Sequence, residues 1–176
     1  MRSPHFHWLI GDIQDDERYR LANLIVSSEV QNAYDLVLID APPRTSLGTI
    51  NALCSSHALL IPTVLDSLSV DAVGRFLRRM NGLRSLAPAL ATVCVVPSLT
   101  QETSLKPDEQ AALIEARQGL PNWSGTAHIT DSFIRHFPTL AKIAGREIGY
   151  ISDRRYVRPA FDALGEEISR RVEFGA

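Results

Sequence analysis

Lysine and clustered glycine are scarce in this sequence of 176 residues. Lys106 and Lys142 are its two lysines, and none of its 10 glycines stands next to another. A Gly-rich loop that cradles phosphates with backbone N–H groups, and ends in a lysine followed by Ser or Thr, cannot be assembled from these residues. The sequence therefore predicts weak or absent ATP binding by this chain alone, and no bound cofactor.

Long apolar runs and paired cysteines are also absent. No apolar stretch approaches the roughly 20 residues that a membrane-spanning helix requires, and no basic flank with a long apolar core opens the chain. Cys54 and Cys94 stand in separate apolar runs without the spacing of a metal site. The net charge of -2 pulls toward neither nucleic acid nor membrane. We expect a cytoplasmic protein without a membrane partner.

Short runs of Val, Ile and Leu alternate with longer segments of helical period, which is typical of an α/β fold with a mainly parallel sheet flanked by helices. The absence of linkers and repeats predicts one domain over residues 1–176. The predicted strands are 6–10, 35–39, 58–62, 91–96 and 126–130. The predicted helices are 15–33, 47–55, 69–86, 108–118, 137–144 and 156–172.

The stretch from Tyr34 to Pro43 is the most informative one. It predicts a buried parallel strand over 35–39 that ends in Asp40 and is followed by Pro42 and Pro43. An acid at the carboxyl end of such a strand lies where open α/β sheets bind ligands, and in a nucleotide-hydrolysing protein it orients the shell of a Mg²⁺ ion, often through water. The alternative is that Asp40 only ends the strand and caps the next helix.

Four segments in order resemble the ParA/MinD family of partition ATPases: Asp-Ala-Pro-Pro from Asp40, Asn-Ala-Leu from Asn51, a strand ending in Ile-Pro at Pro62, and a Ser-rich helix start that leads to Gly74. Farther on, Arg135 and the Arg-rich last helix fit less closely. The resemblance implies a P-loop NTPase-like fold, incomplete here because the phosphate-binding loop is missing. In complete family members the cofactors are ATP and Mg²⁺, with Asp40 at the place of the magnesium-shell acid and Pro42, Pro43 and Arg44 at the place of the switch turn.

The resemblance also implies candidate ligand contacts and partners. Thr100, Thr130 and Arg135 stand near loops that approach the base in the family. Family members dimerise with ATP and contact DNA nonspecifically through basic side chains, which makes a homodimer, a partner subunit or DNA the expected partner. The candidate DNA contacts are Arg75, Arg78, Arg79, Arg154, Arg155 and Arg158. The alternative for the last helix is a solvated, ion-paired face with Glu166, Glu167 and Glu173.

In the family, the phosphate-loop strand lies beside the strand that ends at Asp40, inside the sheet. Its absence leaves unpaired N–H and C=O groups, which folded proteins usually cover. We expect either residues 6–10 or another chain to fill the gap.

Two hypotheses for function follow. The first is a protein of the plasmid or chromosome partitioning or cargo-positioning type that does not bind ATP well by itself, either as a remnant or because the chain lacks an upstream segment. The second is a non-catalytic module that binds a partner subunit or DNA through its arginine-rich helices.

Overall fold

The computed structural model describes residues 15–41, 46–101, 104–143, 146 and 148–172. The chain divides into two compact units, one formed by Met1–His57 with Leu83–Ala91 and the other by Ala58–Gly82 with Thr92–Ala176. None of the helices in the described residues is long and apolar enough to cross a membrane.

The second unit is built on a parallel sheet. Strand β1 (Ala58–Val64) pairs with β2 (Thr92–Thr100), and β2 pairs on its other side with β3 (Thr126–Ile129) and then with the short β4 (Ile134–Arg135). All of these pairings are parallel. Val93, Cys94, Val95 and Val96 of β2 are at most 4% exposed, so the central strand is buried on both faces. This confirms the predicted α/β class.

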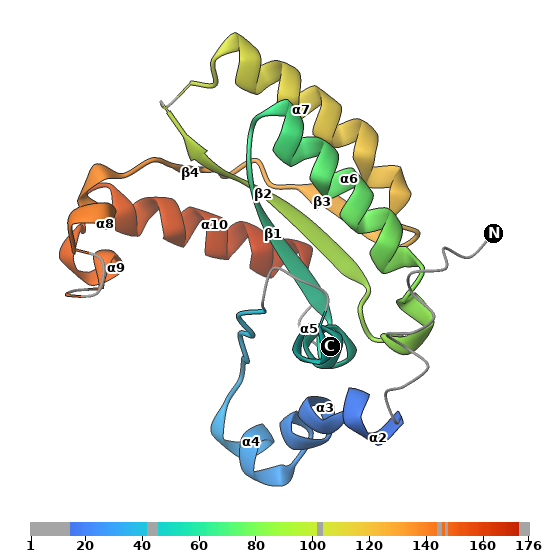
Figure 1. Ribbon diagram of the computed structural model, residues 1–176. Coiled ribbons are helices and arrows are strands. Elements are labelled where there is room, and N and C mark those ends of the chain that lie inside the picture. The colour runs from blue at the N-terminus through green and yellow to red at the C-terminus, as the bar shows by residue number, and fades with distance from the viewer. Residues whose placement is uncertain (1–14, 42–45, 102–103, 144–145, 147, 173–176) are drawn as a thin grey trace. The chain divides into compact units, whose positions relative to one another are not determined.

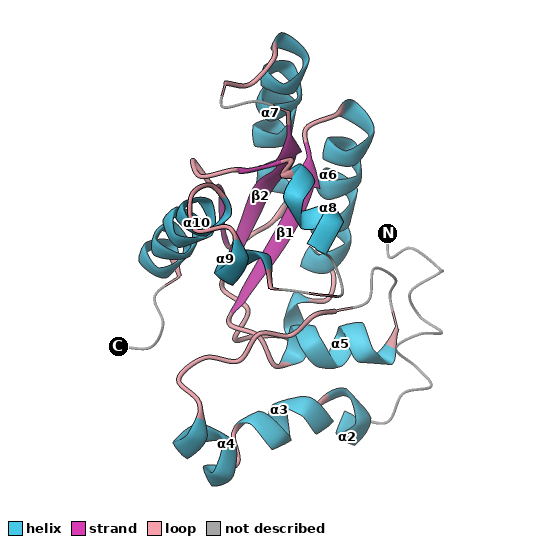
Figure 2. Ribbon diagram, turned by 90° about the vertical axis from the view of Figure 1, so that its left-hand side faces the viewer, coloured by secondary structure: helices cyan, strands magenta, loops and turns pink. Residues whose placement is uncertain are grey.

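Helices cover both faces of this sheet, as a buried parallel strand requires. Helices α6 (Ser67–Asn81) and α7 (Pro107–Gly119) lie on one face, and α10 (Val157–Arg171) lies on the other (Figures 1 and 2). Leu65, Val70, Ala112 and Ala116 form a buried cluster to which both α6 and α7 contribute. The remaining elements of this unit are η3 (Leu120–Asn122), α8 (Pro138–Ile143) and α9 (Gly149–Ser152).

Local chemistry sets the ends of the covering helices. The Asp66 side chain caps α6 by accepting a hydrogen bond from the N–H of Ser69 at 2.7 Å. Helix α7 starts with Pro107 at its first position, and Glu109 reaches back to the N–H of Lys106 at 2.8 Å.

The first unit is helical in its described part. It contains α2 (Asp15–Arg18), α3 (Arg20–Ile25), α4 (Ser28–Ala33), α5 (Leu47–Cys54) and the short η2 (Arg84–Leu86). Asn51 of α5 ties three of these segments together, because its amide oxygen accepts from the N–H of Leu21 at 3.1 Å and its amide nitrogen donates to the carbonyls of Glu17 at 2.7 Å and Leu47 at 3.1 Å.

Two sequence-based predictions for this unit are wrong. The helix expected over 15–33 is broken into three short helices, and none of the residues of α3 and α4 is buried, so no core packing stabilises one long helix. The strand expected over 35–39 is not a strand: residues 35–41 carry no regular secondary structure, and Leu36, Val37 and Leu38 are 53%, 41% and 79% exposed. The predicted strand 6–10 lies outside the described residues.

We predict that Asn51→Ala loosens α2 and α3 from α5. The substitution removes the two long-range hydrogen bonds of the amide, at a cost of about 1–2 kcal/mol in local stability. Hydrogen exchange of the amides of α3 measures the effect, and Asn23→Ala, a change at an exposed position of the same helix, is the control. Equal protection of α3 in the two variants would contradict this account of Asn51.

Candidate functional site

The carboxyl ends of β2 and β3 carry the polar groups that sequence analysis assigned to a ligand site. The Thr130 N–H donates to the carbonyl of Val95 at 3.0 Å, which extends the pairing of the two strands by one residue. The Thr130 hydroxyl donates to the carbonyl of Ser132 at 2.7 Å and closes the turn that follows. At 4% exposure this side chain is committed to the turn.

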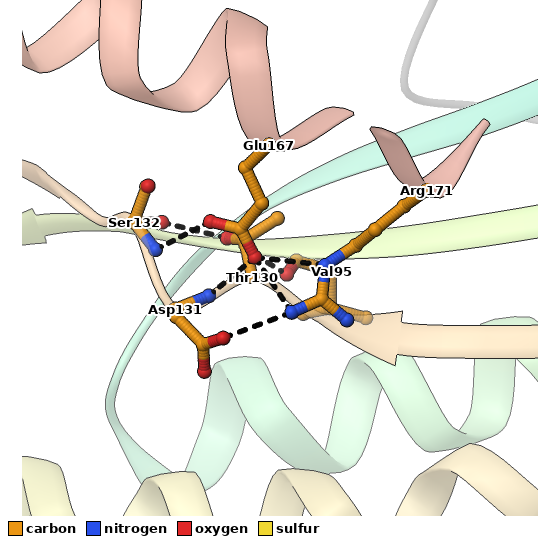
Figure 3. A network of polar contacts seen from close by, with 6 residues as sticks. All are labelled: Val95, Thr130, Asp131, Ser132, Glu167 and Arg171. Carbon is orange, nitrogen blue, oxygen red and sulfur yellow. Dashed lines mark hydrogen bonds and ion pairs between the residues drawn. The ribbon is translucent and has the colours of Figure 1, made fainter. Parts of the chain in front are cut away.

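Glu167 of α10 fixes that turn from the opposite side (Figure 3). Its carboxylate accepts hydrogen bonds from the N–H of Asp131 at 2.8 Å and of Ser132 at 2.7 Å. The Arg171 guanidinium, one helical turn later, donates to the same carboxylate at 2.8 Å and pairs with Asp131 at 3.0 Å. The three side chains and the two backbone N–H groups form one satisfied network that anchors α10 to the end of the sheet.

The charge of Glu167 survives its burial because of these donors. Burial at 4% exposure raises the pKa of the carboxyl, but the N–H groups of Ser132 and Asp131, the Ser132 side chain and Arg171 together outweigh it, and the pKa lies below its ordinary value. Sequence analysis missed this residue because it grouped Glu167 with Glu166 and Glu173 as a solvated face. The spacing of Glu167 and Arg171 by four residues was the signal available for the pair.

A second group of side chains forms an open pocket of about 290 Å³ in the same unit. Its lining residues come from β4, the segments on either side of β4, and the start of α10, and they are Phe133, Arg135, Phe137, Arg155, Tyr156 and Ala160. The Arg135 guanidinium lies 5.0 Å from the ring centre of Phe137 and 5.4 Å from that of Tyr156. Arg155 lies 5.1 Å from the same tyrosine ring. We call these six residues the arginine–aromatic pocket.

The two arginines of this pocket have no carboxylate partner in the part of the chain that the structure describes. Each guanidinium is held by ring faces, which supply attraction without neutralising the charge. Their N–H donors remain available in the plane of the guanidinium. The pocket therefore presents two positive charges beside exposed aromatic surface.

The candidate DNA contacts on α6 have partners of their own. Arg75 pairs with Asp71 one turn earlier, and the Nε of Arg78 donates to Asn122 at 3.3 Å. Arg79 lies in the same helix and is also engaged. Arg75 and Arg78 are therefore already held by partners within this unit.

The other arginine candidates flank the start of α10. Arg154 is exposed, and Arg158 lies 4.8 Å from the ring centre of Tyr150, whose hydroxyl donates to Asp162 at 2.6 Å. This hydrogen bond to Asp162 is the main reason that the pKa of Tyr150 is raised. Arg158 therefore holds α9 against α10, while Arg154 and Arg155 face solvent.

The remaining predicted site residues belong to different units or lie outside the described residues. Thr100 is 1% exposed, and its hydroxyl has no hydrogen-bond partner among the described residues. Asp40 is exposed and belongs to the first unit, which does not place it at the end of a strand. Pro42, Pro43 and Arg44 lie outside the described residues. Across the described ranges, no three His, Cys, Asp or Glu side chains gather in a way that could hold a metal ion.

Comparison with known proteins supplies a relationship for part of the chain. Residues 9–91 match a family described as an AAA domain. The chromosome partitioning protein ParA of Caulobacter vibrioides is 26% identical over 102 residues, which cover 57% of this chain and 38% of the relative. The chromosome-partitioning ATPase Soj of Thermus thermophilus is 29% identical over 87 residues, covering 49% and 35%. A ParA family protein of Mycoplasma pneumoniae is 23% identical over 135 residues, covering 76% and 47%.

These matches confirm the predicted relationship to ParA-type partition ATPases. The chain spans less than half the length of each of these relatives. No solved structure matches the chain.

The Glu167 network predicts an acid-sensitive fold. Because the folded-state pKa of Glu167 is depressed, its contribution to stability is present above the unfolded pKa, near 4.5, and is lost as the pH falls through the lower folded pKa. Glu167→Gln should cost about 3 kcal/mol at neutral pH, because Arg171 and two N–H groups lose a buried anion.

Denaturant unfolding between pH 3 and pH 7 measures both effects. The glutamine variant should show a smaller loss of stability with acid than the unsubstituted chain. Glu166→Gln, at the neighbouring exposed position, should change neither the stability nor its pH dependence by more than a few tenths of a kcal/mol. Similar results for the two variants would contradict the assignment.

Proposed function

We propose that this chain, which is related to the ParA-type partition ATPases, contacts DNA in a chromosome-, plasmid- or cargo-positioning system and does not bind ATP by itself. Its relatives are named as chromosome partitioning proteins. Partitioning acts on DNA in the cytoplasm, where we expect the chain to work.

The observation that carries the proposal is the arginine–aromatic pocket. A phosphate backbone is bound by guanidinium groups whose donors are free, and Arg135 and Arg155 are stacked on rings instead of being neutralised by acids. Stacking also limits the conformations of each guanidinium, so less side-chain entropy is lost when a phosphate binds. Exposed ring surface at Tyr156, which is 48% exposed, adds an apolar contact beside the charges.

Contacts of this type bind the phosphate backbone without reading sequence. The guanidinium groups of Arg135 and Arg155 provide the electrostatic part of DNA binding and do not read the bases. This part weakens as the salt concentration rises. Arg154, exposed beside Arg155, extends the positive surface along the start of α10. By contrast Arg75, already paired with Asp71, would have to give up its partner to bind a phosphate.

The proposal that ATP is not held rests on the residue inventory. Two isolated lysines and ten separated glycines provide no lysine-ended phosphate loop, and an arginine does not replace the compact ammonium group of a loop lysine. Asp40 would be the magnesium-shell acid if a nucleotide were held, with a loop supplied from outside these residues. The second candidate function is a non-catalytic module that binds a partner subunit, and the same arginine–aromatic pocket would be its contact surface.

We predict that the chain binds duplex DNA of unrelated sequences with similar affinity. We compare the unsubstituted chain with the double variant Arg135→Ala, Arg155→Ala. In a plot of the logarithm of the binding constant against the logarithm of the salt concentration, the line for the double variant should fall less steeply than the line for the unsubstituted chain. The slope should decrease by about 1.8, since each phosphate contact contributes about 0.9. Fluorescence anisotropy of a labelled duplex across a NaCl series measures both quantities.

The matched control is Arg75→Ala, because it removes one arginine of the same unit that is already paired with an acid. We expect its binding and slope to equal those of the unsubstituted chain within error. Absence of DNA binding at low salt would overturn the DNA proposal and leave the partner-binding module. An equal loss for Arg75→Ala would show that net charge, and not the pocket, is responsible.

We also predict no detectable heat when Mg²⁺-ATP is titrated calorimetrically into the purified chain. Asp40→Ala is the informative variant, since it removes the one acid at the expected magnesium position. If the chain binds ATP and the binding disappears in Asp40→Ala, the chain retains a nucleotide site and the proposal that it holds no ATP is wrong.

A further inference from the structure

The arginine–aromatic pocket is lined mainly by apolar side chains. Phe133, Arg135 and Phe137 alternate along the segment that contains β4, which places their side chains on one side of it. Tyr156 and Ala160 stand four residues apart at the start of α10 and line the same pocket. A ligand that contacted the arginines alone would leave this apolar lining exposed to water.

The size of the pocket limits what can enter it. Its volume of about 290 Å³ lies at the small end of ligand pockets, which usually measure about 300–1,000 Å³. Ala160 contributes the smallest of the lining side chains and leaves this space open on the side of α10. One flat ring system with a charged group attached to it fits a pocket of these dimensions.

Positive charge lies directly beside the apolar lining. The Arg135 guanidinium is 5.0 Å from the ring centre of Phe137, and the Arg155 guanidinium is 5.1 Å from that of Tyr156. A ligand can therefore place an apolar ring in the pocket and an anionic group on the arginines at the same time. A flat ring with a phosphate attached nearby is the chemistry of a single nucleotide.

Duplex DNA does not offer that combination. Its phosphates lie on the outside, whereas its bases are paired and stacked inside and show only their edges in the grooves. An unpaired base exposes its flat faces, and proteins bind such bases by stacking them on aromatic side chains or on arginine. The pocket is thus better matched to a single strand than to a duplex.

We propose that the arginine–aromatic pocket takes one unpaired nucleotide from a single-stranded stretch of DNA. The base lies against Phe133 and Tyr156, and the phosphate accepts hydrogen bonds from Arg135 and Arg155. Any of the four bases is accepted, because each has a flat face. This inference rests on the proposed contact with DNA and adds the form of DNA that the pocket selects. A duplex is held through its phosphates alone, whereas a single strand is held through its phosphates and one base.

Fluorescence anisotropy with three labelled probes of equal length tests the proposal on the full chain at about 0.15 M NaCl. The probes are an oligothymidylate, its duplex with oligoadenylate, and a strand of abasic sites that keeps the phosphates and lacks the bases. We expect the oligothymidylate to bind about tenfold more tightly than either of the other probes, since stacking of one base contributes roughly that factor.

Two variants remove the space for the base or the ring beneath it. Ala160→Leu fills the pocket without changing a charge, so this variant should bind the oligothymidylate no more tightly than the abasic strand. Tyr156→Leu, at a 48% exposed position, removes a ring and should lose the same advantage. The matched control is Ala163→Leu, at an exposed position of the same helix, which should keep the tenfold difference. Circular dichroism checks that each variant is folded.

Photo-cross-linking of a strand that contains 5-iodouracil, followed by mass spectrometry, locates the base and should give adducts on Phe133, Phe137 or Tyr156. Adducts only outside the pocket would overturn the inference. So would an oligothymidylate that binds no better than the abasic strand, or an Ala160→Leu variant that keeps the tenfold difference. In each of these cases, salt-dependent binding of the duplex would leave the proposed function standing. Failure of all three probes to bind would remove both the inference and the proposed contact with DNA.

Discussion

The burial of β2 on both faces is the constraint on which the second unit depends. Val93, Cys94 and Val95 are at most 1% exposed, and a parallel strand in that position needs a layer of helices on each side. Helix α6 contributes buried apolar side chains such as Leu77 and Met80 to one layer, and α7 adds Ala112 and Ala116. The other layer is α10, whose apolar contribution is smaller, since Val157 and Glu167 are its two buried residues. The polar network of Glu167 therefore holds α10 on the sheet and replaces part of the apolar packing that holds α6 and α7.

The Glu167 network also shows that the arginines of this unit differ: some are held in ion pairs with carboxylates, and others keep their charge unpaired. Arg171 and Asp131 are bound to Glu167 at one end of α10, while Arg155 at the other end stacks on a ring and keeps its charge unpaired. Arg75 is neutralised one turn away on its own helix. Positive residues of similar appearance in the sequence thus differ in what they can bind. Counting arginines along a helix does not distinguish them, whereas the position of the nearest carboxylate does.

The sheet of the second unit was predictable because buried parallel strands leave a simple signal. The runs at 58–62, 91–96 and 126–130 are rich in Val, Ile and Leu, and β1, β2 and β3 lie there. The helix predicted over 69–86 is divided after Asn81, where Gly82 follows and η2 begins at Arg84. The candidate site was harder to predict from the sequence. Arg135 and Arg155 were named, but the aromatic rings that hold them come from residues on both sides of β4, and only the fold brings them together.

The error at residues 35–39 has a different origin. Periodicity and composition report that a segment suits a strand, but a strand also requires a neighbour that accepts its hydrogen bonds, and that neighbour is not encoded locally. Tyr34 to Asp40 has the composition of an inner strand and lies exposed in the described structure. The chemistry expected of Asp40 depends on the same missing neighbour, because a carboxylate is held at the carboxyl edge of a sheet only when its strand is part of that sheet. The position of Asp40 therefore depends on whether residues 36–39 pair with another strand.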